Sequence, residues 1–348
     1  REFKFRWFIV VDNTAMGLLA KGGAMMAPDL EVDLIARKAR GMTLKNALAN
    51  LPLGGGKSGI VFDPKSKDKE KIVRAFAKDI KQFIDAKIYI PGMDVGIGEK
   101  DIAAMIEELK NPRAATGARV RYDELGITGF GVVEAAKAAA KIKNMNLAGA
   151  TAAIQGFGAV GKAAVKFLSE LGVKIIAVSD SKTALLNYGG LDVGKLLAAK
   201  NAGGLNLYES EAEKIELGKE LFVDADILCL AAKEDVLTEE NAGLVKAKII
   251  VEGANMPATE EARKIFFERG ILAVPDIVAN SGGVIAAYCE LSNAEKTDAE
   301  IVKIAFDLTQ KTISKNTEIV LKRALAENKN PREIAVEVAM EKLKQLSQ

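Results

Sequence analysis

The chain has 348 residues, of which 49% are hydrophobic, enough to fill the cores of two domains. Its 49 basic and 47 acidic residues nearly cancel, so the net charge of +2 gives no reason to expect nucleic acid or an anionic membrane as a partner. No apolar run is long enough to span a bilayer and no signal peptide is visible, so we expect a cytoplasmic protein. With no histidine and only Cys229 and Cys289, we expect no metal site and two reduced, buried cysteines.

Lys57 carries the most informative motif, because three glycines precede it and a Ser-Gly pair follows it. Glycines remove side chains from its surroundings, so we expect a tight backbone turn here and close approach of a ligand to the amine. A phosphate-binding loop would need a glycine five residues before the Gly-Lys-Ser triplet. That position holds Leu51, so the phosphate-loop alternative fails on its spacing.

Two lysines precede Lys57 in similar settings, Lys21 before two glycines and Lys45 in a Met-Thr-Leu-Lys-Asn-Ala run. Each alone is most simply a solvated surface charge. Together the three would form a site for a substrate carboxylate. Mutual repulsion and burial would lower the pKa of a lysine from ~10.4 to roughly 7 or 8, where the neutral amine can act as a base.

Asp94 is the fourth candidate. The apolar run Ile88–Ile90 predicts a strand end that Pro91 and Gly92 break, and Glu99–Leu109 has helical spacing. Asp94 therefore lies in a strand-to-helix loop, where functional residues gather, although it could instead be a helix cap. A carboxylate beside an unprotonated lysine suits a reaction with two proton transfers.

The second half of the chain predicts a dinucleotide-binding fold. An apolar strand at Thr151–Gln155 leads into the glycine triplet of Gly156–Gly161, a helix at Lys162–Leu171 and a second strand at Val173–Ser179 that ends on Asp180. The first two glycines would let the backbone turn and approach a pyrophosphate at the helix N-terminus. The third would let helix and strand pack closely.

Three later apolar runs, at residues 226–232, 248–255 and 271–275, are typical of parallel strands buried on both faces. Asn255 and Asn280 follow such strands, at the edge where open parallel sheets bind ligands. The sequence therefore predicts an α/β chain with a doubly wound domain.

The run Leu51–Pro64 resembles the active-site signature of the glutamate, leucine, phenylalanine and valine dehydrogenases, and most closely that of the glutamate enzymes. Similar motifs cover nearly the whole chain: Lys21-Gly-Gly, Met42–Ala47, the Asp94 loop, Ile127–Val132, Gln155–Gly158, Val251–Asn255 and Ala279–Val284. The resemblance implies a Rossmann-type doubly wound dinucleotide domain plus a smaller α/β substrate and oligomerisation domain.

By this resemblance Lys57 is the catalytic lysine and Asp94 the catalytic aspartate. Lys45 would bind the α-carboxylate of the substrate, and Lys21 its side-chain carboxylate. Val284 and Ala287 would line the same substrate pocket. The residues expected to hold NAD or NADP are Thr128, Gly156, Phe157, Gly158, Ala159, Val160, Gly161, Asp180, Ser181, Ala231, Asn255 and Asn280.

The implied reaction is the reversible oxidative deamination of an amino acid to a 2-oxoacid and ammonia. Lys21 favours L-glutamate, which gives 2-oxoglutarate. Ala287 stands where the glutamate enzymes usually have a serine, and so points weakly to a leucine- or valine-type enzyme. We give Lys21 more weight, because an unpaired ammonium is costly in an apolar pocket. An inactive nucleotide-binding regulator is the third reading, and the retained Lys45, Lys57 and Asp94 argue against it.

Asp180 would hydrogen-bond a ribose hydroxyl and repel a 2′-phosphate, whereas Ser179, Ser181 and Lys182 could bind that phosphate, so we slightly favour NAD over NADP.

We place the substrate domain at residues 1–125, with an N-terminal segment missing before it. The Rossmann domain takes 126–285, and helices at 286–348 pack back on the first domain. The resemblance implies a homo-oligomer, a hexamer, and the aromatic strand with Phe3, Phe5, Trp7, Phe8 and Ile9 could add to a neighbour's sheet.

Overall fold

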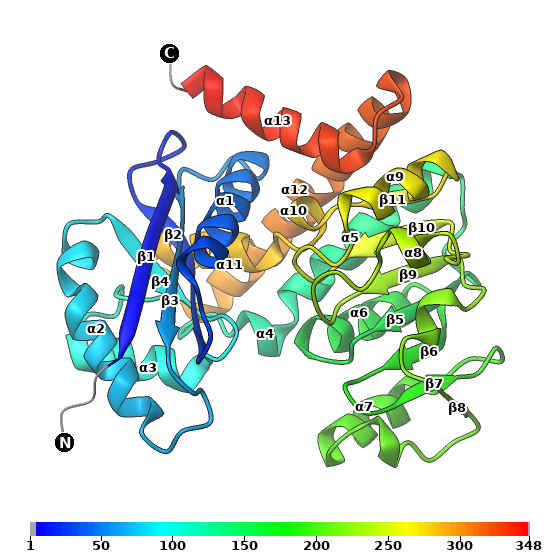
Figure 1. Cartoon of the computed structure of the whole chain (residues 1–348), viewed down its shortest axis with the longest axis horizontal. Helices are drawn as coiled ribbons and strands as arrows, with labels where there is room; N and C mark the ends of the chain where they lie inside the picture. The colour runs from blue at the N-terminus through cyan, green and yellow to red at the C-terminus, as the bar shows by residue number, and fades with distance from the viewer. Residues whose placement is uncertain (1–4, 347–348) are drawn as a thin grey trace. The chain divides into compact units, whose positions relative to one another are not determined.

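The computed structural model of the chain describes residues 5–346 and groups them into two compact units. Unit 1 contains the residues up to Tyr122, Val284–Ala305 and the chain from Val338 on. Unit 2 contains Asp123–Gly283 and Phe306–Glu337. Figure 1 colours the chain from blue to red along these segments.

The sheet of unit 1 is mixed and has four strands in the order β1-β3-β2-β4. β2 (Ala20–Ala27) runs parallel to both β3 (Gly54–Val61) and β4 (Tyr89–Gly92), and β1 (Arg6–Asn13) pairs antiparallel with β3. The smaller α/β sheet predicted for the first half of the chain is therefore confirmed. Pro91 and Gly92 belong to β4 and do not break it, since the Pro91 carbonyl accepts a hydrogen bond from the backbone of Thr116 at 3.0 Å.

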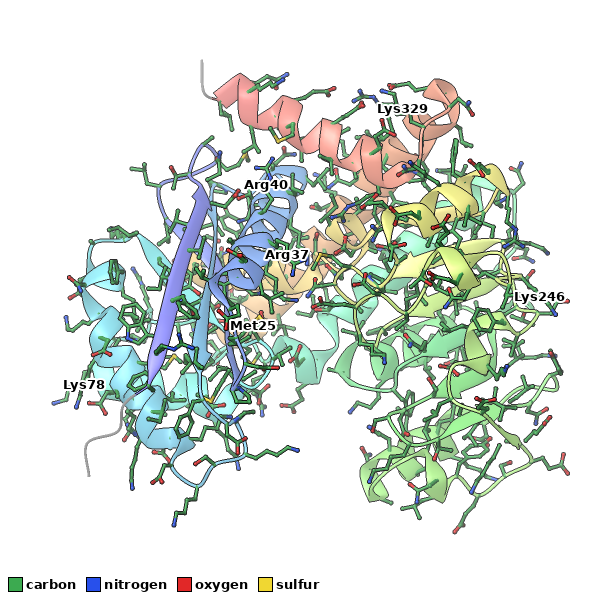
Figure 2. The ribbon with its side chains drawn as sticks, in the orientation of Figure 1. Met25, Arg37, Arg40, Lys78, Lys246 and Lys329 are labelled. Carbon is green, nitrogen blue, oxygen red and sulfur yellow. The ribbon has the colours of Figure 1, made fainter. Side chains whose placement is uncertain are left out.

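Helices cover both faces of this sheet (Figure 1). α1 (Val32–Leu48) lies on one face, and α2 (Lys69–Asp85) and α3 (Glu99–Leu109) pack on the other with a core that includes Met26, Ile60 and Phe76. Side chains alternate along a strand, so Lys21, Gly23 and Met25 of β2 point to the face opposite Met26. In Figure 2, Met25 lies inside this unit, whereas Lys78 of α2 points out to solvent.

The glycine run before Lys57 forms no turn, contrary to the prediction from sequence. Gly54, Gly55 and Gly56 continue straight through β3. A Cβ at Gly55 would lie 2.0 Å from Thr43 Oγ1 and 2.3 Å from the Thr43 backbone nitrogen. The bare backbone therefore serves to let α1 pack directly against the strand that carries Lys57.

β1 is the outermost strand of the sheet, but its aromatic side chains pack inward. The Trp7 ring meets Phe76 and Phe83 edge-on at 5.9 and 6.5 Å, and its Nε1 donates to Asp79 at 2.9 Å. Phe8 packs against the apolar cluster on the α1 face. Phe3, predicted to belong to this strand, lies outside the described residues.

The sheet of unit 2 has seven strands in the order β11-β10-β9-β5-β6-β7-β8. Five of them run parallel: β5 (Thr151–Gln155), β6 (Lys174–Ser179), β9 (Ile227–Leu230), β10 (Ile249–Glu252) and β11 (Leu272–Val274). The chain order changes direction between β5 and β9, which is the doubly wound arrangement predicted from the glycine motif. An antiparallel pair, β7 (Ala184–Leu186) and β8 (Glu213–Ile215), ends the sheet beyond β6.

The helices of unit 2 bury the apolar strands. Phe266 of α9 (Glu260–Glu268) lies in a core with Leu228 and Ile250, while α5 (Ile127–Ile142) and α6 (Ala159–Glu170) contact β10 and β6. Lys246, before β10, points to solvent (Figure 2). The other helices, counted over both units, are α4 (Tyr122–Leu125), α7 (Val193–Ala202), η1 (Leu205–Leu207), η2 (Lys219–Phe222), α8 (Glu239–Ala242), α10 (Asp276–Ala279), α11 (Gly282–Ser292), α12 (Asp298–Glu327) and α13 (Pro331–Leu346).

The C-terminal helices differ from the expectation that all of 286–348 packs on the first domain. Residues 306–337 belong to unit 2, because Phe306 of α12 meets Phe130 of α5 edge-on at 5.0 Å and Lys141 pairs with Glu318 at 3.0 Å. The predicted boundaries near 125 and 285 stay predictions. None of the helices within residues 5–346 combines the length and the apolar character that a bilayer-spanning helix needs.

A buried ionic network fixes the ends of β10 and β11. Arg263 of α9 donates two hydrogen bonds to Glu252 at the end of β10, with Nε–Oε1 at 2.8 Å and Nη2–Oε2 at 2.9 Å. Glu252 also accepts from the backbone of Asp276 at 3.0 Å, and the Asp276 carboxylate pairs with Arg332. The network therefore positions the two segments that lead to Asn255 and Asn280.

We predict that Arg263→Met lowers the free energy of unfolding by about 3 to 5 kcal/mol, because the Glu252 carboxylate would stay buried without its cation. The matched control is Glu260→Gln, which removes the exposed partner of the same arginine and should cost at most about 1 kcal/mol. Urea unfolding followed by circular dichroism measures both values. Equal losses in the two variants would contradict the importance of the buried pair.

Candidate active site

Lys21 and Lys57 point to the same face of the unit 1 sheet. The register pairs Lys21 of β2 with Gly55 of β3, so Gly23 lies beside Lys57, and residues two apart share a face. Both lysines are buried, each residue with 4% of its surface exposed. The middle of a strand is no phosphate-binding loop, which agrees with the rejection of that alternative.

Lys57 forms a buried ion pair with Asp94, in which Nζ donates to Oδ2. Gly23 lies directly beside this pair, since a Cβ at Gly23 would sit 2.3 Å from Asp94 Oδ2. The other carboxylate oxygen accepts from the Val95 backbone at 2.8 Å. Asp94 is thus held in one orientation, with its carboxylate against the lysine amine.

The helix-cap reading of Asp94 is wrong. α3 is capped at Gly98, whose N–H donates to Asp101 Oδ2 at 2.8 Å. Asp94 instead closes a short turn, in which its backbone N–H donates to Ile97 and its carbonyl accepts from Ile97. The carboxylate that stabilises the helix and the carboxylate that meets Lys57 are therefore different residues.

Burial and charge shift the titration of this cluster. Burial, followed by the charge of Lys57, lowers the pKa of Lys21 to about 8, although Glu290 and Asp94 oppose the shift. Burial acts to raise the pKa of the Asp94 carboxyl, but the Lys57 ammonium outweighs it and holds that pKa below its ordinary value. At neutral pH the site therefore contains an ionised Asp94 and a Lys21 close to its titration range.

Lys45 belongs to α1, the helix that packs against β3. It lies in the last turn of this helix and is buried. The neighbouring Asn46 donates from Nδ2 to the Gly54 carbonyl at 2.9 Å, which fixes the end of α1 on β3. The structure thus places all three predicted lysines in unit 1, with Lys45 on the helix that covers the strand of Lys57.

Two side chains near Gly92 and Lys21, those of Thr116 and Tyr122, carried no signal in the sequence. A Cβ at Gly92 would lie 2.6 Å from Lys21 Nζ, 2.8 Å from Thr116 Oγ1 and 3.3 Å from Tyr122 OH, so these atoms surround one point. Thr116 Oγ1 is buried and finds no hydrogen-bond partner among residues 5–346. This cluster could not be predicted from sequence order, because an isolated β-bridge between Gly92 and Thr116 brings the two residues together.

Glu290 of α11 completes this part of unit 1. Its carboxylate accepts from the backbone of Gly117 at 2.9 Å and of Arg119 at 3.4 Å, which holds the segment that carries Thr116. Burial raises the pKa of Glu290 against these hydrogen bonds and against the charge of Lys21. Ala287 lies one helical turn before Glu290 and is also buried, as is Val284.

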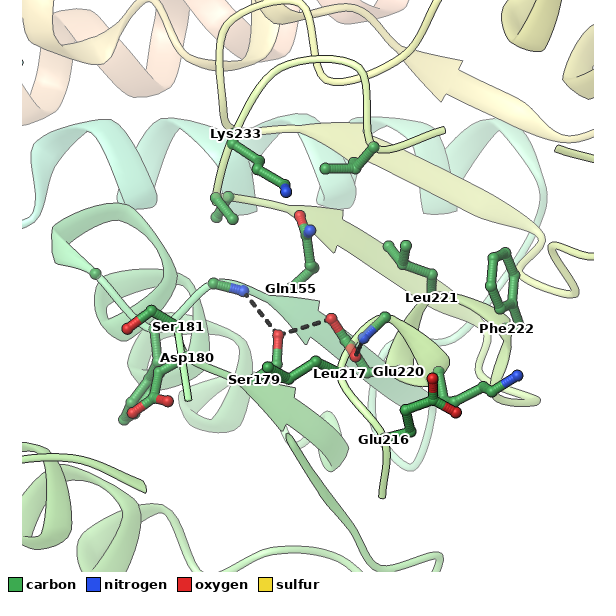
Figure 3. A pocket seen from close by; sticks show the side chains of 18 of the residues that line it. Gln155, Ser179, Asp180, Ser181, Glu216, Leu217, Glu220, Leu221, Phe222 and Lys233 are labelled. Carbon is green, nitrogen blue, oxygen red and sulfur yellow. Dashed lines mark hydrogen bonds between the residues drawn. The ribbon is translucent and has the colours of Figure 1, made fainter. Parts of the chain in front are cut away.

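Unit 2 contains a cavity of 890 Å³ at the carboxyl ends of β5 and β6 (Figure 3). Gly156 has a φ of 94°, and a Cβ there would lie 2.8 Å from the Ala231 backbone. A Cβ at Gly161 would lie 1.8 Å from the Gly156 carbonyl oxygen, so α6 packs on the loop as the spacing predicts. Predicted cofactor residues that line the cavity are Gly156, Phe157, Gly158, Asp180, Ser181 and Ala231.

The other predicted cofactor residues lie elsewhere in unit 2. Ala159, Val160 and Gly161 form the first turn of α6. Asn280 donates from Nδ2 to Asn255 Oδ1 at 3.2 Å, so these two residues meet after β10. A further group consists of Thr128 and Gly283, with Thr128 Oγ1 3.1 Å from the position of a Gly283 Cβ.

The polar groups of unit 2 fit a dinucleotide. Gln155 Oε1 and Asn280 Oδ1 are buried and have no hydrogen-bond partner among the described residues. Gln155 lines the cavity together with Gly158, where α6 begins and where a Cβ would meet nothing within 4 Å. An open helix N-terminus with free acceptors nearby is suited to a pyrophosphate and to amide donors of a ligand.

Comparison with known proteins agrees with this reading. Residues 120–348 match the family model described as glutamate/leucine/phenylalanine/valine dehydrogenase, and residues 4–111 match the dimerisation domain of the same family. The chain is 40% identical to the NAD-specific glutamate dehydrogenase of Staphylococcus aureus, over 80% of this chain and 70% of that protein. It is 36% identical to the NADP-specific glutamate dehydrogenase of Saccharolobus shibatae, over 85% and 74%.

Among solved structures, the hetero-hexameric glutamate dehydrogenase of Thermus thermophilus in its leucine-bound form is similar, with a TM-score of 0.87 and 28% identity. The match covers 98% of this chain and 84% of that one. Sequence motifs, the two α/β units and both family matches agree, and the chain belongs to the glutamate/leucine/phenylalanine/valine dehydrogenase family.

Proposed function

We propose that this chain catalyses the NAD(P)-dependent oxidative deamination of L-glutamate to 2-oxoglutarate and ammonia, and the reverse reaction. The main observation in support of glutamate as the substrate is the buried ammonium of Lys21 beside the Lys57–Asp94 pair. A buried cation without a matching anion is costly, and a substrate carboxylate supplies that anion. The glutamate dehydrogenases among the relatives support the same assignment.

The residues of unit 1 are suited to the proton transfers of this reaction. A bound nicotinamide supplies the hydride acceptor for the substrate α-carbon. Water then adds to the resulting iminium carbon, and the Lys57 amine acts as the base that takes the proton that the water loses. Asp94 accepts a hydrogen bond from Lys57, so it can relay this proton to the nitrogen of the adduct; ammonia then leaves as the adduct hydroxyl gives its own proton to Lys57 and becomes the carbonyl of 2-oxoglutarate.

Hydroxyl groups near Lys21 favour a dicarboxylate substrate over leucine. Ala287 offers no hydroxyl to a side-chain carboxylate, which is the one observation in favour of a branched-chain substrate. Thr116 Oγ1, however, is unpaired and lies near Lys21 Nζ, and Tyr122 OH lies near the same point. We propose that Thr116 supplies the hydrogen bond that Ala287 cannot make. Lys45 would hold the α-carboxylate.

Oligomerisation remains a prediction. The match to a dimerisation domain and the position of β1 at the sheet edge support a homo-oligomer, and the hexamer rests on the family resemblance. The N-terminal segment expected before residue 1 also stays a prediction. Light scattering of the full chain would decide between a monomer and an oligomer.

Lys57→Ala and Asp94→Asn should each lower the rate of glutamate oxidation by about 10² to 10⁴-fold, because each removes a group that moves a proton. The formation of reduced nicotinamide, followed by its absorbance, measures this rate, and titration with NAD measures binding. Binding should change little, since the cavity lies in unit 2.

The matched control for Asp94→Asn is Asp101→Asn, which changes the carboxylate that caps α3. It should cost about 1 kcal/mol of stability and leave the rate intact, whereas Asp94→Asn should do the reverse. If wild-type protein oxidises no amino acid with either dinucleotide, the proposed function is wrong. If Lys57→Ala keeps most of the activity, only its assigned role is wrong.

Lys21→Leu should lower kcat/KM for glutamate by roughly 10 to 150-fold, the factor that corresponds to losing a charge-assisted hydrogen bond worth 1.5 to 3 kcal/mol. The variant should also gain activity on leucine or norleucine, because the pocket wall beside Val284 and Ala287 becomes more apolar. Kinetics with the three amino acids measure both changes.

Ala287→Ser is the opposite change and should strengthen glutamate binding by adding a hydroxyl to the same pocket. A wild-type preference for leucine or valine that Lys21→Leu hardly alters would contradict the glutamate assignment. The amino-acid dehydrogenase assignment would survive that result.

A further inference from the structure

Asp180 is the residue predicted to hydrogen-bond the adenosine ribose. In the structure its carboxylate accepts hydrogen bonds from the protein's own backbone. Its Oδ1 accepts from the N–H groups of Lys182 and Thr183, both at 2.9 Å, and its Oδ2 accepts from Leu205 at 2.9 Å. These three bonds fold two loops against each other and use most of the acceptor capacity of the carboxylate. Asp180 therefore shapes this end of the cavity and has little capacity left for a ligand hydroxyl.

A second carboxylate, that of Glu220 in η2, lies at the same end of the cavity and is 2% exposed. Its Oε1 accepts from the Ser179 hydroxyl at 2.8 Å, and its Oε2 accepts from the Gly218 backbone at 2.7 Å. Ser179 Oγ in turn accepts from the Gly156 N–H at 3.3 Å. Figure 3 shows Ser179 between Glu220 and this backbone nitrogen, with Asp180 and Ser181 on the side of Ser179 away from Glu220.

This chain of hydrogen bonds fixes the polarity of Ser179. Its single hydroxyl proton points to Glu220, so the oxygen presents only acceptor lone pairs to its other neighbours. Ser179 is the last residue of β6, and the end of the second strand is where a dinucleotide fold meets the adenosine ribose. An acceptor there suits a ribose hydroxyl, which donates, and opposes a 2′-phosphate, which only accepts.

The charge of Glu220 acts in the same direction. Solvent screens a buried carboxylate much less than an exposed one, and Glu220 has no cationic partner among its hydrogen bonds, which go to Ser179 and Gly218. A doubly charged phosphate placed near it would meet uncompensated negative charge. Lys182, one of the residues that could have welcomed such a phosphate, is not among the residues that line the cavity.

We propose that Glu220, acting through Ser179, makes this chain select NAD over NADP. The inference rests on the proposed function and specifies its cofactor. Glu220 is a positioning and charge-setting residue, since it touches Ser179 and need not touch the ligand. Three lysines on the same cavity wall, Lys200, Lys219 and Lys233, oppose it, and Lys200 is close enough to Asp180 to act on its charge.

ADP-ribose and 2′-phospho-ADP-ribose test the inference, because they carry the adenosine end of each dinucleotide and no nicotinamide. Calorimetric titration of the full chain should show ADP-ribose binding about tenfold or more tightly. In Glu220→Gln this ratio should fall by about fivefold or more, mainly through tighter binding of the 2′-phosphate. Ser179→Ala should lower the ratio by a smaller factor, mainly through weaker binding of ADP-ribose, since it removes the acceptor for the ribose hydroxyl while the Glu220 charge remains.

The matched control is Glu216→Gln, which makes the same change of charge at an exposed carboxylate on the same cavity. The ratio should stay at the wild-type value in this variant. If Glu220→Gln does not fold, the double variant Ser179→Ala/Glu220→Ala removes both partners together, so that neither is left unpaired, and should also abolish the preference.

Wild-type protein that binds 2′-phospho-ADP-ribose as tightly as ADP-ribose would overturn the inference, and would show that Lys200 outweighs Glu220. An unchanged ratio in Glu220→Gln, or an equal change in Glu216→Gln, would also overturn it. If glutamate is oxidised mainly with NADP, the proposed function stands and this inference falls. If neither nucleotide binds and no amino acid is oxidised, the proposed function falls together with the inference.

Discussion

The ion pair of Lys57 and Asp94, buried beside the second ammonium of Lys21, is the constraint on which unit 1 depends. Burial, followed by the charge of Lys57, lowers the pKa of Lys21 against the opposing charges of Glu290 and Asp94, and an added substrate carboxylate would stabilise the Lys21 ammonium. Glycines in the surrounding strands provide the space that these charged groups need. Gly23 leaves room for the Asp94 carboxylate, and Gly92 leaves room for the Lys21 amine. A side chain at either position would collide with the charged groups.

Buried carboxylates have the opposite role in unit 2. The buried Glu252 and Glu220 and the half-buried Asp180 accept hydrogen bonds from backbone N–H groups, from an arginine or from a serine, and so hold loops in place. Such groups are stable in a protein interior because their oxygens accept hydrogen bonds from nearby donors. Asp180 and Glu220 also line the cavity, so under the proposed selection a residue that need not contact the ligand influences which ligand binds. In unit 1, by contrast, the Thr116 hydroxyl finds no partner among residues 5–346, as expected for a group that meets a substrate.

Local sequence patterns predicted much of the fold and part of the candidate site. The strand Thr151–Gln155 has the predicted bounds, and Gly156 and Gly161 make the close contacts that their spacing implies, because both signals depend only on neighbouring residues. The glycine run at Gly54–Gly56 was misread as a turn, since nothing in the sequence shows that α1 packs against it. Thr116 and Glu220 were missed for a related reason. Each acts through partners 24 or more residues away, and only the fold brings them together.

Titration of Lys21 itself tests the central claim most directly. Nuclear magnetic resonance of lysine labelled at the ε-carbon, assigned with Lys21→Arg, would follow this amine through pH in the free protein and with 2-oxoglutarate bound. We predict a pKa of about 8 in the free protein, because burial and Lys57 disfavour the charge, and a rise on binding, because the added carboxylate favours it. A Lys21 that titrates near ~10.4 and ignores the dicarboxylate would contradict the account.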